Sequence, residues 1–385
     1  MTTLPLAGVR ILSLAEQFPG PYATLLLADL GADVILVERP GTGDPSRRFP
    51  GLFASLNRNK RSVALDLKSE SGRAEFLLLV DTADVVLEGF RPGVMARLAL
   101  DADTLRARKP GLICASISSF GQTGPDTAGA GHDLSIQAAA GMVDVPSGQE
   151  ASTALPVLPL GDIASAMFAA FGIVSALFAR SRHGHGAQID VSMLDSLVSW
   201  MTPFLVPPMN GLPTRTLPPE DPGYGVFATA GGQQITLSIA GEDHMWDALC
   251  RLLGLPGLAP LREQERSDQA ARIRPQLRTA IAGWPHDELC RQLQVERIAF
   301  GPVLALDQVL RHPQMVARRM TVTAPGPSGP QTFVRQPLLF NGVAPATVAP
   351  VPALGQHNAE LRTELLGQPP SVATRPERQP DTALR

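Results

Sequence analysis

The sequence predicts an α/β fold in which helices cover a mostly parallel sheet and a smaller α+β domain is inserted. Two observations carry this prediction. Short β-branched runs alternate with helical stretches over residues 1–120, and a Pro-rich stretch at 201–222 separates them from a region of different pattern. The composition agrees, because a chain of 385 residues with 44% hydrophobic and 18% charged residues can bury a sizeable core.

The first part of the chain repeats a strand-then-helix rhythm. A helix over 20–32 has Pro21 at its start and Gly31 at its end, and a second helix covers 69–83. The predicted strands are 9–14, 33–38, 62–67, 84–90 and 112–120. No GxGxxG motif follows the first strand, so the phosphates of a nucleotide ligand must be held in another way.

The second part of the chain predicts a different domain and a return to the first. We expect a large domain over 1–200, a linker over 201–222 and a small α+β domain over 223–320. The small domain opens with a hairpin over 224–240, in which a Gly-Gly turn joins two alternating runs. Residues 321–366 return to the large domain and end in a helix, and the polar, Pro-rich tail 367–385 is expected to be disordered.

Charge and cysteine content exclude several classes of protein. A net charge of −3 and the lack of a basic stripe argue against nucleic-acid binding, since "RNKRS" (58–62) is too small for a duplex. Three scattered cysteines form no framework, and the N-terminus has no signal-peptide pattern, which predicts a reducing, cytoplasmic location. The uncharged run 163–179 is at the lower limit for a membrane span and poor in Leu and Ile, so we interpret it as a buried helix and expect no membrane association.

Asp162 stands at the start of that apolar run, in "LPVLPLGDIASAMFAAFGIVSALFARSRHG" (155–184). Aspartate before an apolar helix is a preferred N-cap, and spacing alone favours this structural role. A helix that presents a reactive acid is the alternative. The two roles are physically compatible, because the partial positive charge at a helix N-terminus keeps a buried carboxylate ionised.

Several segments together resemble one family. They are "GVRILSLAEQFPGPYATLLLADLGADVILVERPGTGD", "NRNKRSVALDLKS", "EGFRPGV", "SSFGQTGP", "GHDLSIQAAAGM", "PLGDIASAMFAAFGIVSALFARSRHGHGAQIDVSMLDS" and the closing "PALGQHNAELRTELLG". In this order they are similar to the class III CoA-transferases, the CaiB/BaiF group, which share their fold with α-methylacyl-CoA racemases. The resemblance covers nearly the whole chain.

The resemblance implies a fold, an assembly and a reaction. The fold is a large Rossmann-like domain built from both chain ends with a small domain inserted, and family members form interlocked homodimers. The reaction moves CoA from an acyl-CoA to a carboxylic acid, with the CoA thioester as substrate and no tightly bound cofactor. Asp162 is then the nucleophile that attacks the thioester carbonyl and forms first a mixed anhydride and then an aspartyl thioester.

A racemase remains the alternative within this fold. Racemases carry a His-Asp pair at the position of His132 and Asp133, and there the histidine and the catalytic aspartate act as acid and base on the α-carbon. Glu242 stands where racemases place a further acid, although a carboxylate at a helix start explains it equally well. Racemases usually follow the catalytic aspartate with a glycine-rich turn, whereas here the sequence from Asp162 is "DIASAM", and this difference and the closing segment favour a transferase. A third alternative is a CoA-binding protein without catalysis, against which the retained Asp162 argues.

Basic residues near strand ends are the candidates for binding CoA phosphates. The resemblance implies Arg39 and Arg91, assisted by Lys60 or Arg61 from the "RNKRS" loop, and a guanidinium fork suits phosphate oxygens. Each residue alone is also explained as a solvated strand-end charge. His183 and His185 lie in a Gly-rich turn without a third ligand nearby, so we predict no metal.

Overall fold

The computed structural model describes residues 4–143, 158–213, 221–326, 329–345 and 348–366. The chain divides into two compact units. The large unit comprises 1–143, 156–201 and 320–385, and the small unit comprises 144–155 and 202–319. The α/β class with a large unit built from both chain ends is therefore confirmed. The predicted tail 367–385 lies outside the described residues.

A parallel sheet of six strands forms the centre of the large unit, in the order β3-β2-β1-β4-β5-β6. The strands are β1 (Arg10–Ser13), β2 (Asp33–Glu38), β3 (Lys60–Ala64), β4 (Val85–Glu88), β5 (Ile113–Ser118) and β6 (Gln188–Ser192). The order reverses between β1 and β4, and doubly wound sheets of this kind bind ligands beyond the carboxyl ends of the strands at that point.

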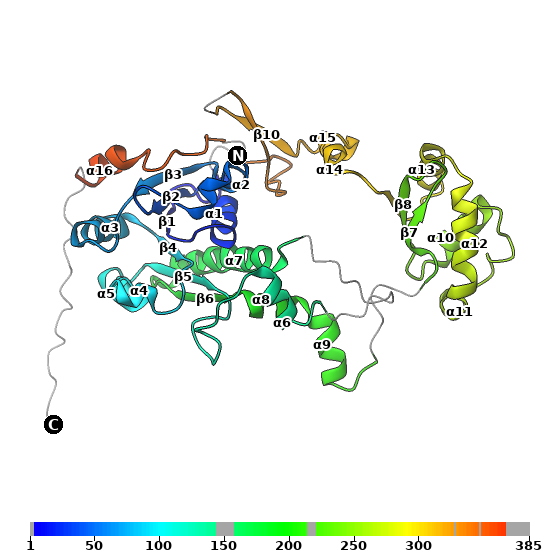
Figure 1. The fold of residues 1–385 in the computed structure, drawn as a ribbon, viewed down its shortest axis with the longest axis horizontal. Coiled ribbons are helices and arrows are strands. Elements are labelled where there is room, and N and C mark those ends of the chain that lie inside the picture. Colours follow the sequence, from blue (N-terminus) through cyan, green and yellow to red (C-terminus); the bar gives the residue numbers. More distant parts are fainter. Residues whose placement is uncertain (1–3, 144–157, 214–220, 327–328, 346–347, 367–385) are drawn as a thin grey trace. The chain divides into compact units, whose positions relative to one another are not determined.

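Helices cover both faces of this sheet (Figure 1). Alternate strand residues point to opposite sides and form two separate cores. One core includes α1 (Pro19–Asp29), α6 (Asp133–Ala139), α7 (Leu160–His183) and α8 (Met193–Trp200). The other includes α3 (Glu70–Thr82), α4 (Val94–Arg97), α5 (Ala102–Arg108) and α16 (Asn358–Leu366). Two shorter elements, η1 (Pro45–Arg48) and α2 (Pro50–Asn57), connect β2 to β3.

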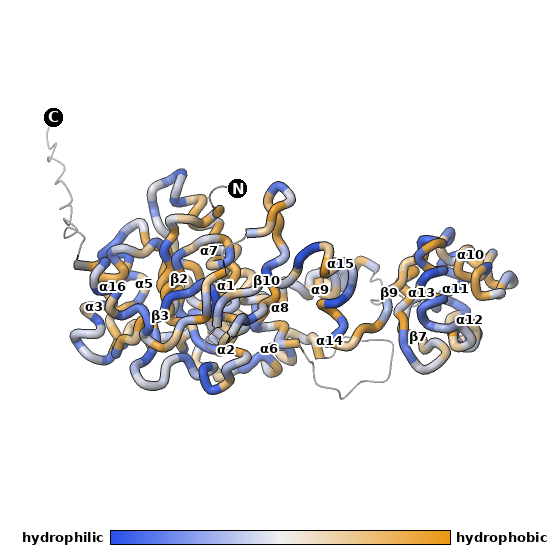
Figure 2. Tube along the Cα trace, turned by 90° about the horizontal axis from the view of Figure 1, so that it is seen from above, coloured by the Kyte–Doolittle hydropathy of each residue, from blue (hydrophilic) through white to orange (hydrophobic). Residues whose placement is uncertain are grey.

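Helix α7 is the long apolar helix that the sequence predicts. It is long and apolar enough to cross a membrane by length and composition alone. Its Ala-rich face packs into the core, with Ala166, Ala169 and Ile173 buried among strand residues. The hydropathy colouring in Figure 2 places hydrophobic segments around the sheet and hydrophilic segments in the surrounding loops. One face of α7 therefore packs into the core, while other apolar side chains of the helix, such as Phe171, are exposed.

The C-terminal part of the chain completes the large unit. Strands β10 (Thr321–Ala324) and β11 (Gln331–Val334) form an antiparallel pair. Helix α16 then packs beside β3, where Leu361 is buried and the side chain of Asn358 accepts a hydrogen bond from the Ala64 backbone at 3.0 Å. Glu364 of this helix pairs with Arg10 and Arg61. These contacts explain why the chain must return to its first domain.

The small unit has its own sheet and core. Strands β7 (Tyr224–Ala228), β8 (Gln234–Ser238) and β9 (Phe300–Pro302) are antiparallel, and the predicted Gly-Gly hairpin is confirmed. Its helices are α9 (Thr202–Met209), α10 (Asp243–Leu252), α11 (Glu263–Asp268), α12 (Ala270–Ala282), α13 (His286–Val295), α14 (Leu306–Val309) and α15 (Pro313–Ala317). Trp246 is fully buried in this core. Helix α9 lies within the segment that the sequence predicts as a linker.

Candidate active site

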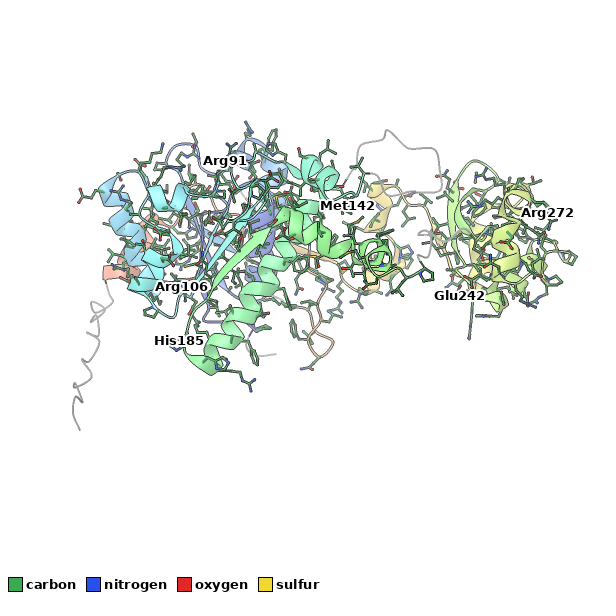
Figure 3. The ribbon with its side chains drawn as sticks, turned by 90° about the horizontal axis from the view of Figure 1, so that it is seen from below. Arg91, Arg106, Met142, His185, Glu242 and Arg272 are labelled. Atoms are coloured by element: carbon green, nitrogen blue, oxygen red, sulfur yellow. The ribbon has the colours of Figure 1, made fainter. Side chains whose placement is uncertain are left out.

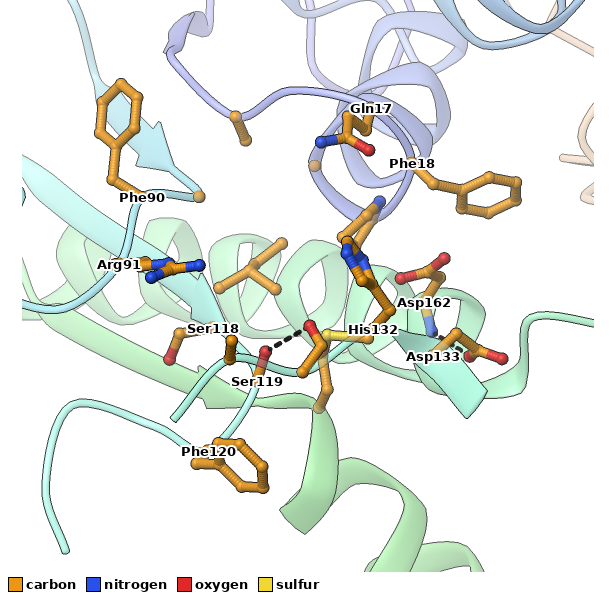
Figure 4. A pocket seen from close by; sticks show the side chains of 18 of the residues that line it. Gln17, Phe18, Phe90, Arg91, Ser118, Ser119, Phe120, His132, Asp133 and Asp162 are labelled. Carbon is orange, nitrogen blue, oxygen red and sulfur yellow. Dashed lines mark hydrogen bonds between the residues drawn. The ribbon is translucent and has the colours of Figure 1, made fainter. Parts of the chain in front are cut away.

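A cavity of about 420 Å³ lies where the order of the central sheet reverses. Its walls come from the loops after β1, β4 and β5 and from the starts of α6 and α7 (Figure 4). The polar side chains that line it include Glu16, Gln17, Arg91, Ser118, Ser119, His132, Asp133 and Asp162. The cavity therefore contains three of the four catalytic candidates that the sequence offers.

Asp162 lies in the first turn of α7 and is not its N-cap. The N-cap residue is Pro159, which offers no side-chain acceptor, so the N-terminal N–H groups need another partner. Asp133 provides it: its Oδ1 accepts hydrogen bonds from the Gly161 N–H at 2.7 Å and the Asp162 N–H at 3.2 Å. Asp133 therefore caps α7, which is the role that the sequence spacing suggested for Asp162. The Asp162 carboxylate does not cap the helix and lines the cavity.

The environment of Asp162 raises its pKa to about 6, first because burial disfavours the charged form and second because the Asp133 carboxylate is close. Within the described residues, no side chain donates a hydrogen bond to this carboxylate. The group is still mainly ionised at neutral pH, but its basicity exceeds that of an ordinary aspartate. Such a shift is typical of carboxylates that react.

The loop after β1 faces the start of α7 across the cavity. Its Gln17 has a φ of 68°, which is uncommon for a residue other than glycine. Asp44 accepts a hydrogen bond from the Gln17 N–H at 3.1 Å, and Glu38 in turn accepts one from the Asp44 N–H at 3.0 Å. Arg47 pairs with Glu38 at 2.7 Å. A network of buried carboxylates therefore fixes the backbone of one cavity wall.

A second cavity, of about 760 Å³, lies beyond the carboxyl ends of β2, β3 and β4. Three cationic side chains line it: Arg39, Lys68 and Arg97. Glu16 and Phe90 line both cavities. The Arg39 guanidinium lies 3.6 Å from the Glu16 carboxylate, and burial raises the pKa of Glu16. The two cavities are thus neighbours, one with a reactive acid and the other with cations.

Arg39 follows β2 and Arg91 follows β4, so both lie at strand ends as the sequence predicts, with β1 between the two strands, but they line different cavities. Arg39 lines the cationic cavity, whereas Arg91 lines the cavity of Asp162. Figure 4 shows the Arg91 guanidinium pointing into that cavity. Their expected role in binding CoA phosphates stays a prediction.

The prediction that Lys60 and Arg61 assist at the same strand ends is corrected. Strand β3 begins at Lys60, so both residues lie at the amino end of the sheet, opposite the cavities. The Lys60 Nζ is fully buried and donates to the Pro21 carbonyl and the Thr24 hydroxyl at 2.8 Å, and burial lowers its pKa. Arg61 pairs with Asp33 and Glu364. Both side chains stabilise the fold.

Glu242, the remaining catalytic candidate, belongs to the small unit, whereas Asp162 belongs to the large unit (Figure 3 labels Glu242). It is the N-cap residue of α10, and its Oε2 accepts a hydrogen bond from the Ala240 N–H at 2.7 Å. Its racemase-like role stays a prediction. Among the described residues, no group of three or more His, Cys, Asp or Glu side chains could hold a metal ion.

Sequence reasoning missed several residues of the two cavities. Lys68 and Arg97 line the cationic cavity, and Ser118 lines the cavity of Asp162. Lys68 follows a strand and could have been found by the same rule as Arg39. Arg97 lies on α4, so its position depends on how that short helix packs against β4, which no sequence spacing defines.

Comparisons with known proteins agree with this fold. The model of CoA-transferase family III matches residues 6–358. A succinate–glutarate CoA-transferase from Agrobacterium fabrum is 31% identical over 94% of this chain and 96% of its own length. A succinyl-CoA:mesaconate CoA-transferase from Haloarcula marismortui is 35% identical over 93% of this chain and 96% of its own length. The crystal structure of a CAIB/BAIF family protein from Brucella suis has a TM-score of 0.80 at 31% identity, with 94% of this chain and 100% of that chain covered.

These matches define first a class of enzyme and then a family. The class is the transferases that act on a CoA thioester. The chain belongs to CoA-transferase family III. The resemblance seen in the sequence is therefore confirmed.

Proposed function

We propose that this enzyme transfers CoA from an acyl-CoA to a carboxylic acid through covalent intermediates on Asp162. One observation carries this proposal: Asp162 lines a cavity with a carboxylate that no described side chain neutralises, while Asp133 caps the helix in its place. The positive end of α7 keeps the carboxylate ionised, and burial increases its basicity. A carboxylate in this state is a competent nucleophile toward a thioester.

The proposed reaction exchanges CoA in four balanced steps. An Asp162 oxygen attacks the donor carbonyl, the carbon–sulfur bond breaks, and CoA leaves as a thiolate from a mixed anhydride. The thiolate attacks the Asp162 carbonyl carbon and releases the donor acid, which leaves an aspartyl-CoA thioester. The acceptor carboxylate then attacks the aspartyl thioester and displaces the CoA thiolate, which forms a second anhydride. The thiolate attacks the carbonyl carbon that came from the acceptor acid, and this gives the new acyl-CoA and free Asp162. No further cofactor is needed.

The two cavities suit the two ends of CoA. Arg39, Lys68 and Arg97 in the cationic cavity would hold the phosphates of the nucleotide, because charged donors bind phosphate oxygens well. The pantetheine arm would pass Glu16 and Phe90, which line both cavities, and deliver the thioester to Asp162. Binding energy far from the reacting carbonyl then serves to position it.

His132 keeps α-proton transfer as the second candidate, because it lines the same cavity as Asp162. A racemase exchanges the α-hydrogen of a 2-methylacyl-CoA with D₂O even without an acceptor acid. A transferase has no step at the α-carbon and requires an acceptor. We expect no enzyme-dependent deuterium uptake and the appearance of a new acyl-CoA when an acid is added. Rapid deuteration that His132→Ala abolishes, without transfer to any acid, would identify a racemase.

A homodimer is also part of the proposal. Four large apolar side chains of α7 are exposed at helical spacing: Met167, Phe171, Val174 and Phe178. Their opposite face on the helix packs into the core. A contiguous exposed apolar stripe is typical of a protein–protein interface. The interlocked homodimer that the sequence resemblance implies would cover the stripe with a second copy of the chain.

A further inference from the structure

We propose that Arg91 binds the second carboxylate of a dicarboxylic acyl group and so selects dicarboxylic acids as substrates. This inference rests on the proposed function, because that function brings the reacting carbonyl to Asp162. It starts from where the cationic side chains of the two cavities lie. Arg39, Lys68 and Arg97 line the cationic cavity, and Arg91 alone lines the cavity that contains Asp162.

Arg91 is available for a ligand. Within the described residues, it is the only lysine or arginine that lines the Asp162 cavity, and no carboxylate forms an ion pair with it. Figure 4 shows its guanidinium on the opposite side of the cavity from Asp162, near Ser118. A ligand carbonyl at Asp162 therefore has a cation facing its distal end.

Ser118 adds a second donor on that side. Its Oγ accepts a hydrogen bond from the Gly121 N–H at 3.1 Å, and it donates to no other described residue. The hydroxyl proton is thus free to point into the cavity. A guanidinium fork with an adjacent hydroxyl matches the planar carboxylate, which accepts two or more hydrogen bonds.

The chemistry of the acyl group explains why such a contact would discriminate. A monocarboxylic acid loses its charge when it becomes a thioester, whereas a dicarboxylic acid keeps one carboxylate. That carboxylate is costly to enclose unless it is paired. The carboxylates of Glu16, Asp133 and Asp162 also make this cavity unfavourable for an unpaired anion. Arg91 supplies the positive charge that would balance the second carboxylate of the ligand.

A phosphate-binding role for Arg91 is the competing explanation, and a binding measurement separates the two. Asp162→Asn prevents turnover, so calorimetry on this variant can compare the affinities for succinyl-CoA and butyryl-CoA, which have acyl chains of equal length. We expect a preference for succinyl-CoA of roughly tenfold or more, as a charge-assisted contact provides. Adding Arg91→Gln should weaken succinyl-CoA binding alone and remove the preference, and Arg91→Lys should restore part of it.

Arg97→Gln is the matched control, since it removes a cation from the neighbouring cavity. It should weaken both thioesters equally and keep the preference. Equal weakening of both thioesters by Arg91→Gln would overturn the proposal in favour of a phosphate contact. An absent preference before Arg91 is changed would overturn it as well. Because this experiment measures binding only, its outcome is independent of whether Asp162 forms a covalent intermediate.

Discussion

At the scale of single residues, the site depends on a division of roles between two aspartates. Asp133 accepts hydrogen bonds from the N–H groups at the start of α7, whereas the carboxylate of Asp162, in the first turn of the same helix, lines the cavity. The proximity of the two carboxylates also raises the pKa of Asp162. A cap and a reactive group can therefore occupy one helix terminus without competing for the same atoms.

This division predicts that the reactive carboxylate destabilises the native state at neutral pH. The pKa of Asp162 is raised to about 6 in the folded protein, so its favourable contribution is complete at low pH and is lost as the pH rises through about 6. Asp162→Asn should thus be more stable than the wild type above about pH 7, with a difference that vanishes near pH 4. Chemical denaturation across this range measures it.

Asp101→Asn is the control with the opposite sign. A hydrogen bond from the Thr104 backbone lowers the pKa of Asp101, which caps α5. Its contribution is present above the ordinary pKa of aspartate and is lost on acidification, so Asp101→Asn should reduce stability at neutral pH. If Asp162→Asn instead costs stability at neutral pH as Asp101→Asn does, the Asp162 carboxylate is itself a cap.

At the scale of elements, the start of α7 requires a glycine. A Cβ added to Gly161 would lie 3.0 Å from the Asp133 Oδ1, which accepts the Gly161 N–H. Gly161→Ala should therefore displace the Asp133 carboxylate, weaken the cap and lower kcat, despite the better helix propensity of alanine. Steady-state kinetics and thermal unfolding measure the two effects.

Gly51 provides the matched control, because it occupies the equivalent early position in α2 with no atom within 4 Å of its added Cβ. Gly51→Ala should leave kcat unchanged and stability equal or slightly higher. Equal behaviour of the two variants would show that the approach of Asp133 to α7 does not matter for catalysis.

Sequence patterns defined most elements of the large unit, because its strands are buried runs with clear boundaries. β2 has its predicted limits, whereas β3 begins two residues before its predicted start (62 − 60 = 2). In both the predicted and the observed strand, Lys60 and Arg61 lie at the amino end, so their position away from the cavities follows from the direction of β3 in the parallel sheet. Strand ends are poorly defined by sequence where a basic residue lies buried among backbone acceptors, as Lys60 does.

The candidate site was predictable only in part. Motif resemblance brought forward Asp162, His132 and Arg91, which line one cavity. The cap provided by Asp133 could not be predicted, since it joins residues of α6 and α7 and depends on how these two helices pack. The left-handed conformation of Gln17 was equally hidden, because no glycine marks it.

At the scale of the whole molecule, the exposed stripe on α7 carries the dimer proposal. Phe171 has 71% of its surface exposed, which is unfavourable for an isolated chain. We expect the wild type to sediment as a dimer and Phe171→Glu to sediment as a monomer or as a weaker dimer, because a carboxylate cannot be buried unpaired in an apolar interface. Analytical ultracentrifugation distinguishes these states.

Leu78 on α3 is a suitable control, since it is also exposed but lies outside the stripe. Leu78→Glu should leave the dimer intact. A wild type that is monomeric at micromolar concentration, or dimers unaffected by Phe171→Glu, would show that another surface is used.

The central claim is that Asp162 carries the acyl group and then CoA. The direct measurement is peptide mass spectrometry after incubation with an acyl-CoA and reduction with borohydride, which converts an aspartyl thioester to a side-chain alcohol. We expect this change on Asp162 alone, and none in Asp162→Asn, whose amide cannot form the thioester. Transfer without any modification of Asp162, or modification of Glu16 in its place, would contradict the account.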